Sequence, residues 1–355
     1  MSTLLIPAAG ASTRFNFNRP KFLLQHPLGG TMLENSIAGL GNLKKQGIEK
    51  VLIISLAEYF KEISAEKLIN SLKERFLIPV ELLLLNKPTS SMVDTVVKGI
   101  EFIDQETAII VKDCDNYVKL KEGSLDVDFN LISTVDISVF NNIRPDNKSF
   151  LSINETGMLL NIVEKKIISS HINIGCVKFL SSSDFISCAM EMKSTSEAFI
   201  SDVIRLMLNR NNQFLALKAD DYEDWGTQKD WLNYIGKFQT IFIDIDGVIA
   251  NNENPLSLNG GWDHFVPINE NCQYLLEIQK SEKSKIVFTT SRSGHYREIL
   301  SKKLNDQGFK DYLLIMDLPH AKRILINDFA PTNPFPSAIS INISRNSNNL
   351  KDFLI

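Results

Sequence analysis

Almost wholly apolar runs alternate with amphipathic stretches along this chain, and this alternation constrains the fold more than any other feature of the sequence. In the first two thirds, the apolar runs predict strands at 3–7, 50–55, 80–85, 108–112, 136–140, 172–179 and 214–217. Helical patterns lie between them at 32–46, 58–76, 92–103 and 196–209. Strands that are apolar on both faces and separated by helices are typical of a mainly parallel sheet covered on both sides. The pattern therefore predicts an α/β fold.

The alternation begins again after residue 237. A second series of elements is expected, with helices at 269–280 and 296–307 and strands at 240–245, 285–289, 313–316, 324–327 and 338–343. A chain of 355 residues is also longer than one hydrophobic core usually serves. We therefore predict two domains, 1–237 and 238–355, each Rossmann-like with three layers.

Composition and charge exclude several classes of protein. The chain is 44% hydrophobic and 23% charged, carries a net charge of −4, and has scattered lysines, so no nucleic acid partner is expected. No signal peptide is recognised, and no apolar run approaches the ~18 residues of a membrane span. We expect a cytoplasmic protein without a membrane partner. The four cysteines form no C-x-x-C pair, so buried free thiols are expected, with a disulfide or zinc site as the alternative.

The first predicted strand leads into a turn of small residues. It ends in Pro-Ala-Ala-Gly-Ala-Ser-Thr-Arg-Phe, and Pro-Lys-Phe-Leu follows. Backbone N–H groups in such a turn can approach a phosphate closely, and the residues that supply it here are Ala8, Ala9, Gly10 and Ser12. Arg14 and Lys21 can neutralise a triphosphate and the pyrophosphate that leaves. The turn taken alone is also compatible with an ordinary βα loop.

The combined motif resembles the signature of the sugar-phosphate nucleotidyltransferase family, and the resemblance extends through the first domain. It implies a mixed, mainly parallel sheet and a Mg²⁺ ion bound by Asp115, which follows an apolar strand, and by Asp224 in an Asp-Trp-Gly-Thr segment. It also implies contacts to the sugar phosphate from Glu164, Lys165, Asn173 and Gly175. The alternatives are that Asp115 caps a helix, Asp224 only forms a turn and Lys165 is a solvated surface lysine.

The chemistry of such a site is physically coherent. Attack of a phosphate oxygen on an α-phosphorus brings two anions together, and Mg²⁺ with Arg14 and Lys21 offsets their repulsion. The chain departs from the family where many relatives carry a glycine-rich segment that contacts the base. Here Ser90 and Ser91 offer hydroxyl groups for the nucleotide instead, and the choice between CTP, UTP, GTP and dTTP stays open.

A second candidate site begins where the strand predicted at 240–245 ends. Asp244 and Asp246 are two residues apart, so in an extended segment both side chains point to the same side. They can therefore face one metal ion and one phosphoryl group. Gly247 allows the chain to turn sharply afterwards.

This segment resembles the first motif of the haloacid-dehalogenase (HAD) phosphatase superfamily. Thr290 matches the second motif and Asp328 the fourth, while Lys322 or Arg323, with Lys322 preferred, matches the third. The resemblance implies that Asp244 attacks phosphorus to form an aspartyl-phosphate and that Asp246 acts as the general acid and base. Mg²⁺ would be bound by Asp244, Asp246 and Asp328. The insertion at 248–270 is too short for a full cap, so a capless HAD-like domain is expected.

Together these motifs predict a bifunctional enzyme. It would transfer a nucleotidyl group from a nucleoside triphosphate to a sugar phosphate, releasing pyrophosphate, and would hydrolyse a phosphate monoester, in the synthesis of a surface polysaccharide precursor. One alternative is a cytidylyltransferase for a non-sugar phosphate such as phosphocholine or glycerol phosphate. Another is a protein with a decayed, non-catalytic domain. A homo-oligomer is compatible with the sequence but not indicated by it.

Overall fold

The computed structural model describes residues 2–10, 20–103, 107–139, 145–192, 198–252, 261–281, 283–328 and 338–354. The chain divides into two compact units, Met1–Trp231 and Leu232–Ile355. The division falls within helix α6 (Gln228–Ile235), a few residues before the predicted boundary after residue 237.

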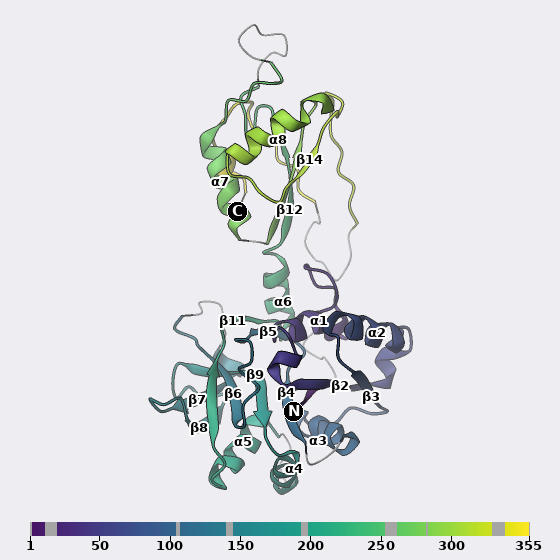
Figure 1. Ribbon diagram of the computed structural model, residues 1–355, viewed down its shortest axis with the longest axis vertical. Coiled ribbons are helices and arrows are strands. Elements are labelled where there is room, and N and C mark those ends of the chain that lie inside the picture. The colour runs from purple at the N-terminus through teal and green to yellow at the C-terminus, as the bar shows by residue number, and fades with distance from the viewer. Residues whose placement is uncertain are drawn as a thin grey trace. The chain divides into compact units, whose positions relative to one another are not determined.

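Unit 1 is built on a nine-stranded sheet (Figure 1). Its main path runs β10-β6-β9-β4-β1-β2-β3, and the β7–β8 hairpin joins at β9. Along this path only β9 is antiparallel to its neighbours β4 and β6, so the sheet is mixed but mainly parallel, as predicted. The strands are β1 (Ser2–Ala8), β2 (Ile48–Leu56), β3 (Val80–Leu85), β4 (Ala108–Lys112), β6 (Asn130–Asp136), β7 (Ser149–Ile153), β8 (Leu159–Glu164), β9 (His171–Phe179) and β10 (Phe214–Lys218).

Helices cover both faces of this sheet, because side chains alternate between the faces along each strand. On β1, Leu4 and Ile6 join the core under α1 (Met32–Ala38) and α2 (Ala65–Phe76), whereas Leu5 joins the core on the other face. That second core is covered by α3 (Met92–Phe102), α4 (Ser182–Glu191) and α5 (Ile200–Asn209). Burying one such leucine or isoleucine stabilises the fold by about 1.5–3 kcal/mol. Unit 1 is therefore a three-layer α/β/α structure.

Several local predictions for unit 1 need correction. The strand predicted at 136–140 is instead β6, which ends at Asp136, and the chain then turns through 137–139. The helix predicted at 32–46 ends as α1 at Ala38, and that predicted at 58–76 is helical as α2 only from Ala65. Short 3₁₀ turns lie at Lys21–Leu23 (η1), Lys44–Gln46, Ala57–Phe60, Pro145–Asn147, Gly294–Tyr296 and Leu350–Asp352.

A short antiparallel pair of strands that was not predicted positions the candidate site. β5 (Asn116–Lys119) pairs with β11 (Asp221–Asp224), and Asp224 lies opposite Asn116. Each strand has only four residues, too few for a clear hydrophobic period. This pairing brings Asp115, which directly precedes β5, close to Asp224, the last residue of β11.

Unit 2 contains a three-stranded parallel sheet in the order β12 (Gln239–Asp244), β13 (Ser284–Thr289) and β14 (Leu313–Ile315). Its helices are α7 (Asn269–Lys280) and α8 (Arg297–Asp306). Both helices contribute to one core, where Leu275 and Leu304 are buried with Phe288. These elements agree with the first part of the pattern predicted for this region.

The last two strands predicted for unit 2 are wrong. Residues 324–327 and 338–343 form neither helix nor strand. Ile326 is 88% exposed and Ile339 is 78% exposed, so these apolar runs are not packed into a core. An apolar run becomes a strand only where another strand accepts its backbone hydrogen bonds. Among the described residues β12 pairs with β13 alone. The capless HAD-like fold expected for this unit therefore stays a prediction.

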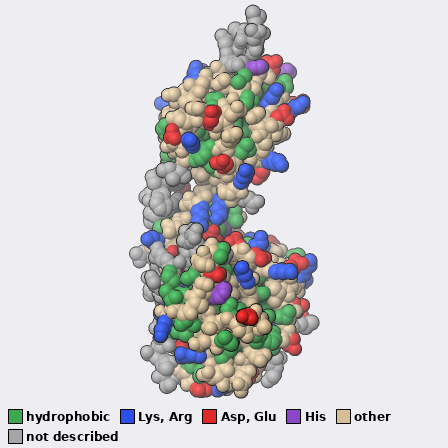
Figure 2. Space-filling view, turned by 90° about the vertical axis from the view of Figure 1, so that its left-hand side faces the viewer, with side chains coloured by type: hydrophobic (Ala, Val, Ile, Leu, Met, Phe, Trp, Pro, Cys, Tyr) green, Lys and Arg blue, Asp and Glu red, His purple; other side chains and the backbone are tan. Residues whose placement is uncertain are grey.

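All four cysteines are buried and unpaired, as predicted. On the face shown in Figure 2, Lys and Arg side chains are interspersed with Asp and Glu. In the part of the chain that the structure describes, every helix is too short or too polar to cross a membrane.

His26, in the loop before α1, is buried against two tryptophans of unit 1. Its ring centroid lies 5.1 Å from that of Trp225 and 5.8 Å from that of Trp231. Nδ1 accepts a hydrogen bond from the backbone N–H of Leu28 at 3.2 Å, which requires that this nitrogen carry no proton. Burial, assisted by the positive charge of Arg75, lowers the pKa of His26 from 6.5 to about 4. The folded protein therefore holds this histidine neutral.

We predict that His26 makes unit 1 less stable as the pH falls. The His26 side chain is protonated near pH 6.5 in the unfolded chain but only near pH 4 in the folded protein. The free energy of unfolding is therefore highest above pH 6.5 with respect to this group, and it falls as the pH is lowered toward 4. The loss amounts to about 3 kcal/mol. Urea denaturation followed by tryptophan fluorescence should show a steeper decline for the wild type than for His26→Gln. Equal slopes in the two proteins would contradict this prediction.

Candidate active site

Two carboxylates from distant parts of unit 1 meet beside Gly226. Asp115 directly precedes β5, and Asp224 ends β11. A Cβ placed on Gly226 would lie 3.1 Å from Asp224 Oδ1 and 3.4 Å from Asp115 Oδ2. The backbone N–H of Trp225 also donates to the Asp115 carbonyl at 3.0 Å. The structure thus brings together the two residues predicted to bind Mg²⁺.

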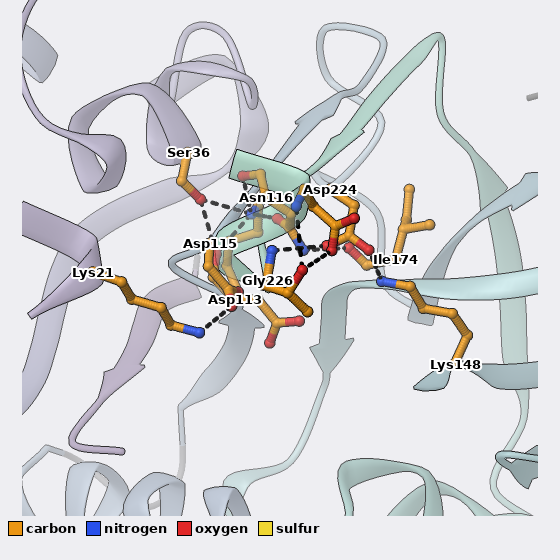
Figure 3. A network of polar contacts seen from close by, with 12 residues as sticks. Lys21, Ser36, Asp113, Asp115, Asn116, Lys148, Ile174, Asp224 and Gly226 are labelled. Carbon is orange, nitrogen blue, oxygen red and sulfur yellow. Dashed lines mark hydrogen bonds and ion pairs between the residues drawn. The ribbon is translucent and has the colours of Figure 1, made fainter. Parts of the chain in front are cut away.

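Each of these carboxylates is paired with a lysine (Figure 3). Lys21, in η1, forms an ion pair with Asp115, and Lys148 Nζ lies 2.5 Å from Asp224 Oδ2. Figure 3 shows the two lysines pointing toward the acids from opposite sides. Burial disfavours the charged carboxylate of Asp115, but Lys21 outweighs this effect and lowers its pKa. Burial likewise disfavours the Lys148 ammonium, but Tyr222 and Asp224 outweigh it and raise the pKa.

A third acid, Asp113, stands two residues before Asp115 and was not assigned a role from the sequence. Burial and the negative charge of Asp115 raise the pKa of Asp113 to about 6. Its backbone N–H donates to the Gly175 carbonyl at 2.8 Å, which ties the end of β4 to β9. Asp113 and Asp115 therefore repel each other, and a cation beside them would reduce this repulsion.

Lys112, the last residue of β4, makes hydrogen bonds that hold the turn carrying these acids. Its side chain is fully buried, and Nζ donates to Ser36 Oγ at 2.9 Å, to the Asp113 carbonyl at 2.8 Å and to the Asn116 side chain. Burial lowers the pKa of this ammonium. Asn116 in turn donates from Nδ2 to the Ile174 carbonyl at 2.9 Å. This network fixes the turn that carries Asp113 and Asp115.

Gly175, predicted to contact the sugar phosphate, lies against Asp113. Its φ is +74°, and a Cβ there would be 2.0 Å from Asp113 Oδ2 and 2.8 Å from Asn116 Nδ2. Only glycine fits this position without a shift. Asn173 Oδ1 accepts from the Gly175 N–H at 3.0 Å, so the predicted Asn-x-Gly element borders the acid cluster.

The predicted phosphate loop begins at the same edge of the sheet. β1 and β4 are parallel neighbours, so the turn after Ala8 and the acids after Lys112 both lie at the carboxyl ends of their strands. Ala8 and Ala9 are buried, and the Gly10 carbonyl accepts from Tyr59 Oη at 2.8 Å. Ser12 and Arg14 lie outside the described residues.

The hydroxyls predicted to contact the nucleotide lie at the start of α3. Ser91 is the N-cap, and its Oγ accepts from the Asp94 backbone N–H at 3.1 Å. Ser90 Oγ donates to the Asp94 carboxylate. A hollow of about 380 Å³ lies next to these serines, lined by the residues from Leu85 to Thr89 and by α3. Ser91 thus has a structural use besides any contact to a nucleotide.

The predicted Glu-Lys pair lies at the end of the β7–β8 hairpin, and its two side chains contact different partners. Glu164 Oε2 accepts from the hydroxyls of Ser149 and, at 2.8 Å, of Ser201. Lys165 has φ +56°, and its Nζ lies 4.5 Å from the centre of the Phe199 ring. The lysine of this hairpin that reaches the acids is Lys148, which directly precedes β7 and stands in no motif that would single it out.

The donor set of unit 1 fits Mg²⁺. This ion is usually bound by one or two carboxylates, with water and substrate phosphates completing its shell. Asp115 and Asp224 supply two such carboxylates. Among the described residues no three His, Cys, Asp or Glu side chains form a group able to hold a metal. A fully protein-bound metal, such as a structural zinc, is therefore not found in that part of the chain.

In unit 2, Asp246 is held in a fixed orientation at the end of β12. Arg292 is 3% exposed, and its Nη2 donates to Asp246 Oδ1 at 2.7 Å. Nη1 of the same arginine donates to the carbonyls of Trp262 and His264 at 2.7 and 2.9 Å. Thr290 Oγ1 donates to Asp246 Oδ2 at 2.9 Å. The structure thus brings together Asp246 and Thr290 and adds Arg292, which was not assigned a role from the sequence.

The cation beside Asp244 is Arg323 rather than the preferred Lys322. Arg323 Nη2 lies 3.2 Å from Asp244 Oδ1, and Lys322 is exposed. Burial and Asp246 raise the pKa of Asp244, although Arg323 acts in the opposite direction. Asp328 is not grouped with the two acids among the described residues, because the run before it is not paired with β12.

Unit 1 shares its fold with sugar nucleotidyltransferases of known structure, which cover the N-terminal 65% or so of the chain. No protein-family model matches the sequence, and no curated protein matches it.

Three of the similar structures illustrate the likeness. The nucleoside-diphosphate-sugar pyrophosphorylase from Vibrio cholerae RC9 is 18% identical with a TM-score of 0.55, covering 65% of this chain and 98% of that one. The inositol-1-phosphate CTP transferase from T. maritima is 14% identical with a TM-score of 0.51, covering 64% and 90%. A UDP-glucose pyrophosphorylase complexed with UDP-glucose is 16% identical with a TM-score of 0.50, covering 66% and 96%. Identities this low show a common fold.

We predict that Gly175→Ala destabilises unit 1 much more than Gly41→Ala. Both glycines have φ +74°, but a Cβ on Gly41 meets nothing within 4 Å, whereas one on Gly175 strikes Asp113. The backbone strain, about 1–2 kcal/mol, is therefore shared, and the clash adds about 2 kcal/mol for Gly175→Ala alone. Urea denaturation of the two variants checks the difference. Equal losses would show that the Asp113 side chain moves away freely.

Proposed function

We propose that unit 1 is a Mg²⁺-dependent nucleotidyltransferase that couples a nucleoside triphosphate to a phosphorylated acceptor, preferably a sugar phosphate, and releases pyrophosphate. The observation that carries this proposal is the meeting of Asp115 and Asp224 beside Gly226 at the carboxyl edge of the sheet. The likeness to sugar nucleotidyltransferases in fold supports it.

Different residues among those described can contact the triphosphate and the acceptor. Lys21 approaches from the chain that follows the phosphate loop, where it can bind the triphosphate together with Arg14, whose role stays a prediction. Asn173 and Gly175 border the acids from β9, where the acceptor would lie. When bound, Mg²⁺ supplies positive charge that neutralises the phosphate oxygens approaching each other.

No side-chain nucleophile is required by this reaction. An oxygen of the acceptor phosphate attacks the α-phosphorus, the bond to the leaving pyrophosphate breaks, and the lysines offset the charge on both anions. Positioning and charge are therefore the whole contribution of the protein, which agrees with a site made of fixed acids and lysines.

For unit 2 we infer a second activity, the hydrolysis of a phosphate monoester through an aspartyl-phosphate on Asp244. The supporting observation is that Asp246 is fixed beside it by Thr290 and the buried Arg292. A carboxyl group oriented in this way can give its proton to a leaving alcohol, and the carboxylate that results can accept a proton from the attacking water. A place in surface polysaccharide synthesis stays a prediction from the pairing of two phosphoryl-transfer chemistries.

We predict that the purified protein releases pyrophosphate when given Mg²⁺, one of the four NTPs and a suitable acceptor. The acceptor panel should contain sugar 1-phosphates and, because one similar structure is an inositol-1-phosphate CTP transferase, non-sugar phosphates. Asp115→Asn should lower the rate by about 10²-fold or more, since half of the carboxylate pair is lost. Asp128→Asn, at an exposed position, is the matched control. Silence across the whole panel would reject the proposal.

A separate prediction concerns unit 2. The wild type should hydrolyse p-nitrophenyl phosphate in the presence of Mg²⁺, and Asp244→Asn should reduce turnover to background because the attacking carboxylate is gone. Asp306→Asn, at the exposed end of α8, should retain the activity of the wild type. Turnover that survives Asp244→Asn would show that the aspartyl-phosphate assignment is wrong.

A further inference from the structure

Lys148 lies at the acid pair of unit 1 and is not a solvated surface lysine. It directly precedes β7, its side chain is 17% exposed, and its ammonium contacts Asp224 at 2.5 Å and the Tyr222 hydroxyl at 3.0 Å. Asp224 itself is 18% exposed. A half-buried ion pair of this kind is costly to break without a replacement partner for the charge that is left.

A divalent cation bound to Asp115 and Asp224 would compete with the lysine that each carboxylate now contacts. Each carboxylate now has one lysine, Lys21 on Asp115 and Lys148 on Asp224. A cation on these carboxylates competes with both ammonium groups, which then need new anions. The reaction proposed for unit 1 supplies two, a triphosphate and the phosphate of the acceptor.

The position of Lys148 in the sheet indicates which of the two anions it receives. Ser149, the next residue, is the register partner of Glu164, and the Lys165 N–H donates to the Lys148 carbonyl at 2.9 Å. Lys148 therefore stands at the hairpin end where the acceptor is expected, opposite Lys21 (Figure 3). Lys165 was predicted for this role, but its ammonium lies over the Phe199 ring.

We propose that Lys148 binds the phosphate of the acceptor and is held on Asp224 until a divalent cation takes that carboxylate. This inference rests on the function proposed for unit 1 and replaces Lys165 by Lys148 as its phosphate-binding lysine. Lys148 acts by charge and position, and the bonds that form and break remain those of the nucleotidyl transfer.

The first test uses Mg²⁺ alone, on the full-length protein without nucleotide. The Mg²⁺ concentration that gives half of the maximal shift in melting temperature should fall about tenfold in Lys148→Met, because the competing charge-assisted hydrogen bond is gone. It should rise in Lys148→Arg, whose guanidinium can bind Asp224 with two hydrogen bonds. The order Met, Lys, Arg supports the proposal, and equal midpoints overturn it. If Lys148→Met does not melt cooperatively, the comparison of Arg with the wild type decides.

The second test uses inorganic phosphate in saturating Mg²⁺. Phosphate should raise the melting temperature of the wild type, of Lys148→Arg and of Lys165→Met, and should do so at about tenfold higher concentration in Lys148→Met. Lys166→Met, at an exposed position in the same hairpin end, is the matched control. Retained protection in Lys148→Met, with loss in Lys165→Met or Lys21→Met, overturns the proposal.

Steady-state kinetics separates this inference from the function on which it rests. With an acceptor found in the panel, Lys148→Met should raise the KM for the acceptor phosphate about tenfold while leaving the KM for the nucleotide close to that of the wild type. An unchanged acceptor KM overturns the role of Lys148 alone. A wild type that releases no pyrophosphate with any acceptor rejects the function of unit 1 instead.

Discussion

The repulsion between carboxylates gathered in a half-buried space is the constraint on which the structure of unit 1 depends. Asp115 and Asp224 meet beside Gly226, Asp113 stands two residues before Asp115, and burial favours the protonated forms of Asp113 and Asp115. Lys21 outweighs the effect of burial at Asp115, and Lys148 forms an ion pair with Asp224. The pKa of Asp113 is raised to about 6, with burial as the larger cause and the negative charge of Asp115 as the next. The surrounding fold can be understood as the support that keeps these charges in place.

The sequence predicted the large elements well because burial leaves a long, regular signal. β3, β4 and α7 have the predicted bounds, and the mixed, mainly parallel sheet follows from apolar runs separated by helices. Elements whose signal is short or depends on a partner were not predictable in this way. β5 and β11 were missed, and the runs at 324–327 and 338–343 were predicted as strands although they are exposed.

The same division holds for the candidate sites. Asp115, Asp224 and Lys21 could be singled out because they stand in local motifs after strands, and the structure brings them together. Lys148 and Arg292 could not, since their importance comes from contacts across the fold and not from neighbours in sequence. Local patterns thus identified residues that stand in motifs after strands better than residues whose role depends on contacts across the fold.

The β5–β11 pair has a consequence for how unit 1 is made. Asp115 is translated well before Asp224, yet the strands beside them hydrogen-bond to each other. A chain still emerging from the ribosome can pair β1 with β2 and β4 but cannot complete this ribbon until the last part of unit 1 has been added. The acid cluster is therefore expected to be finished only after the sheet that supports it.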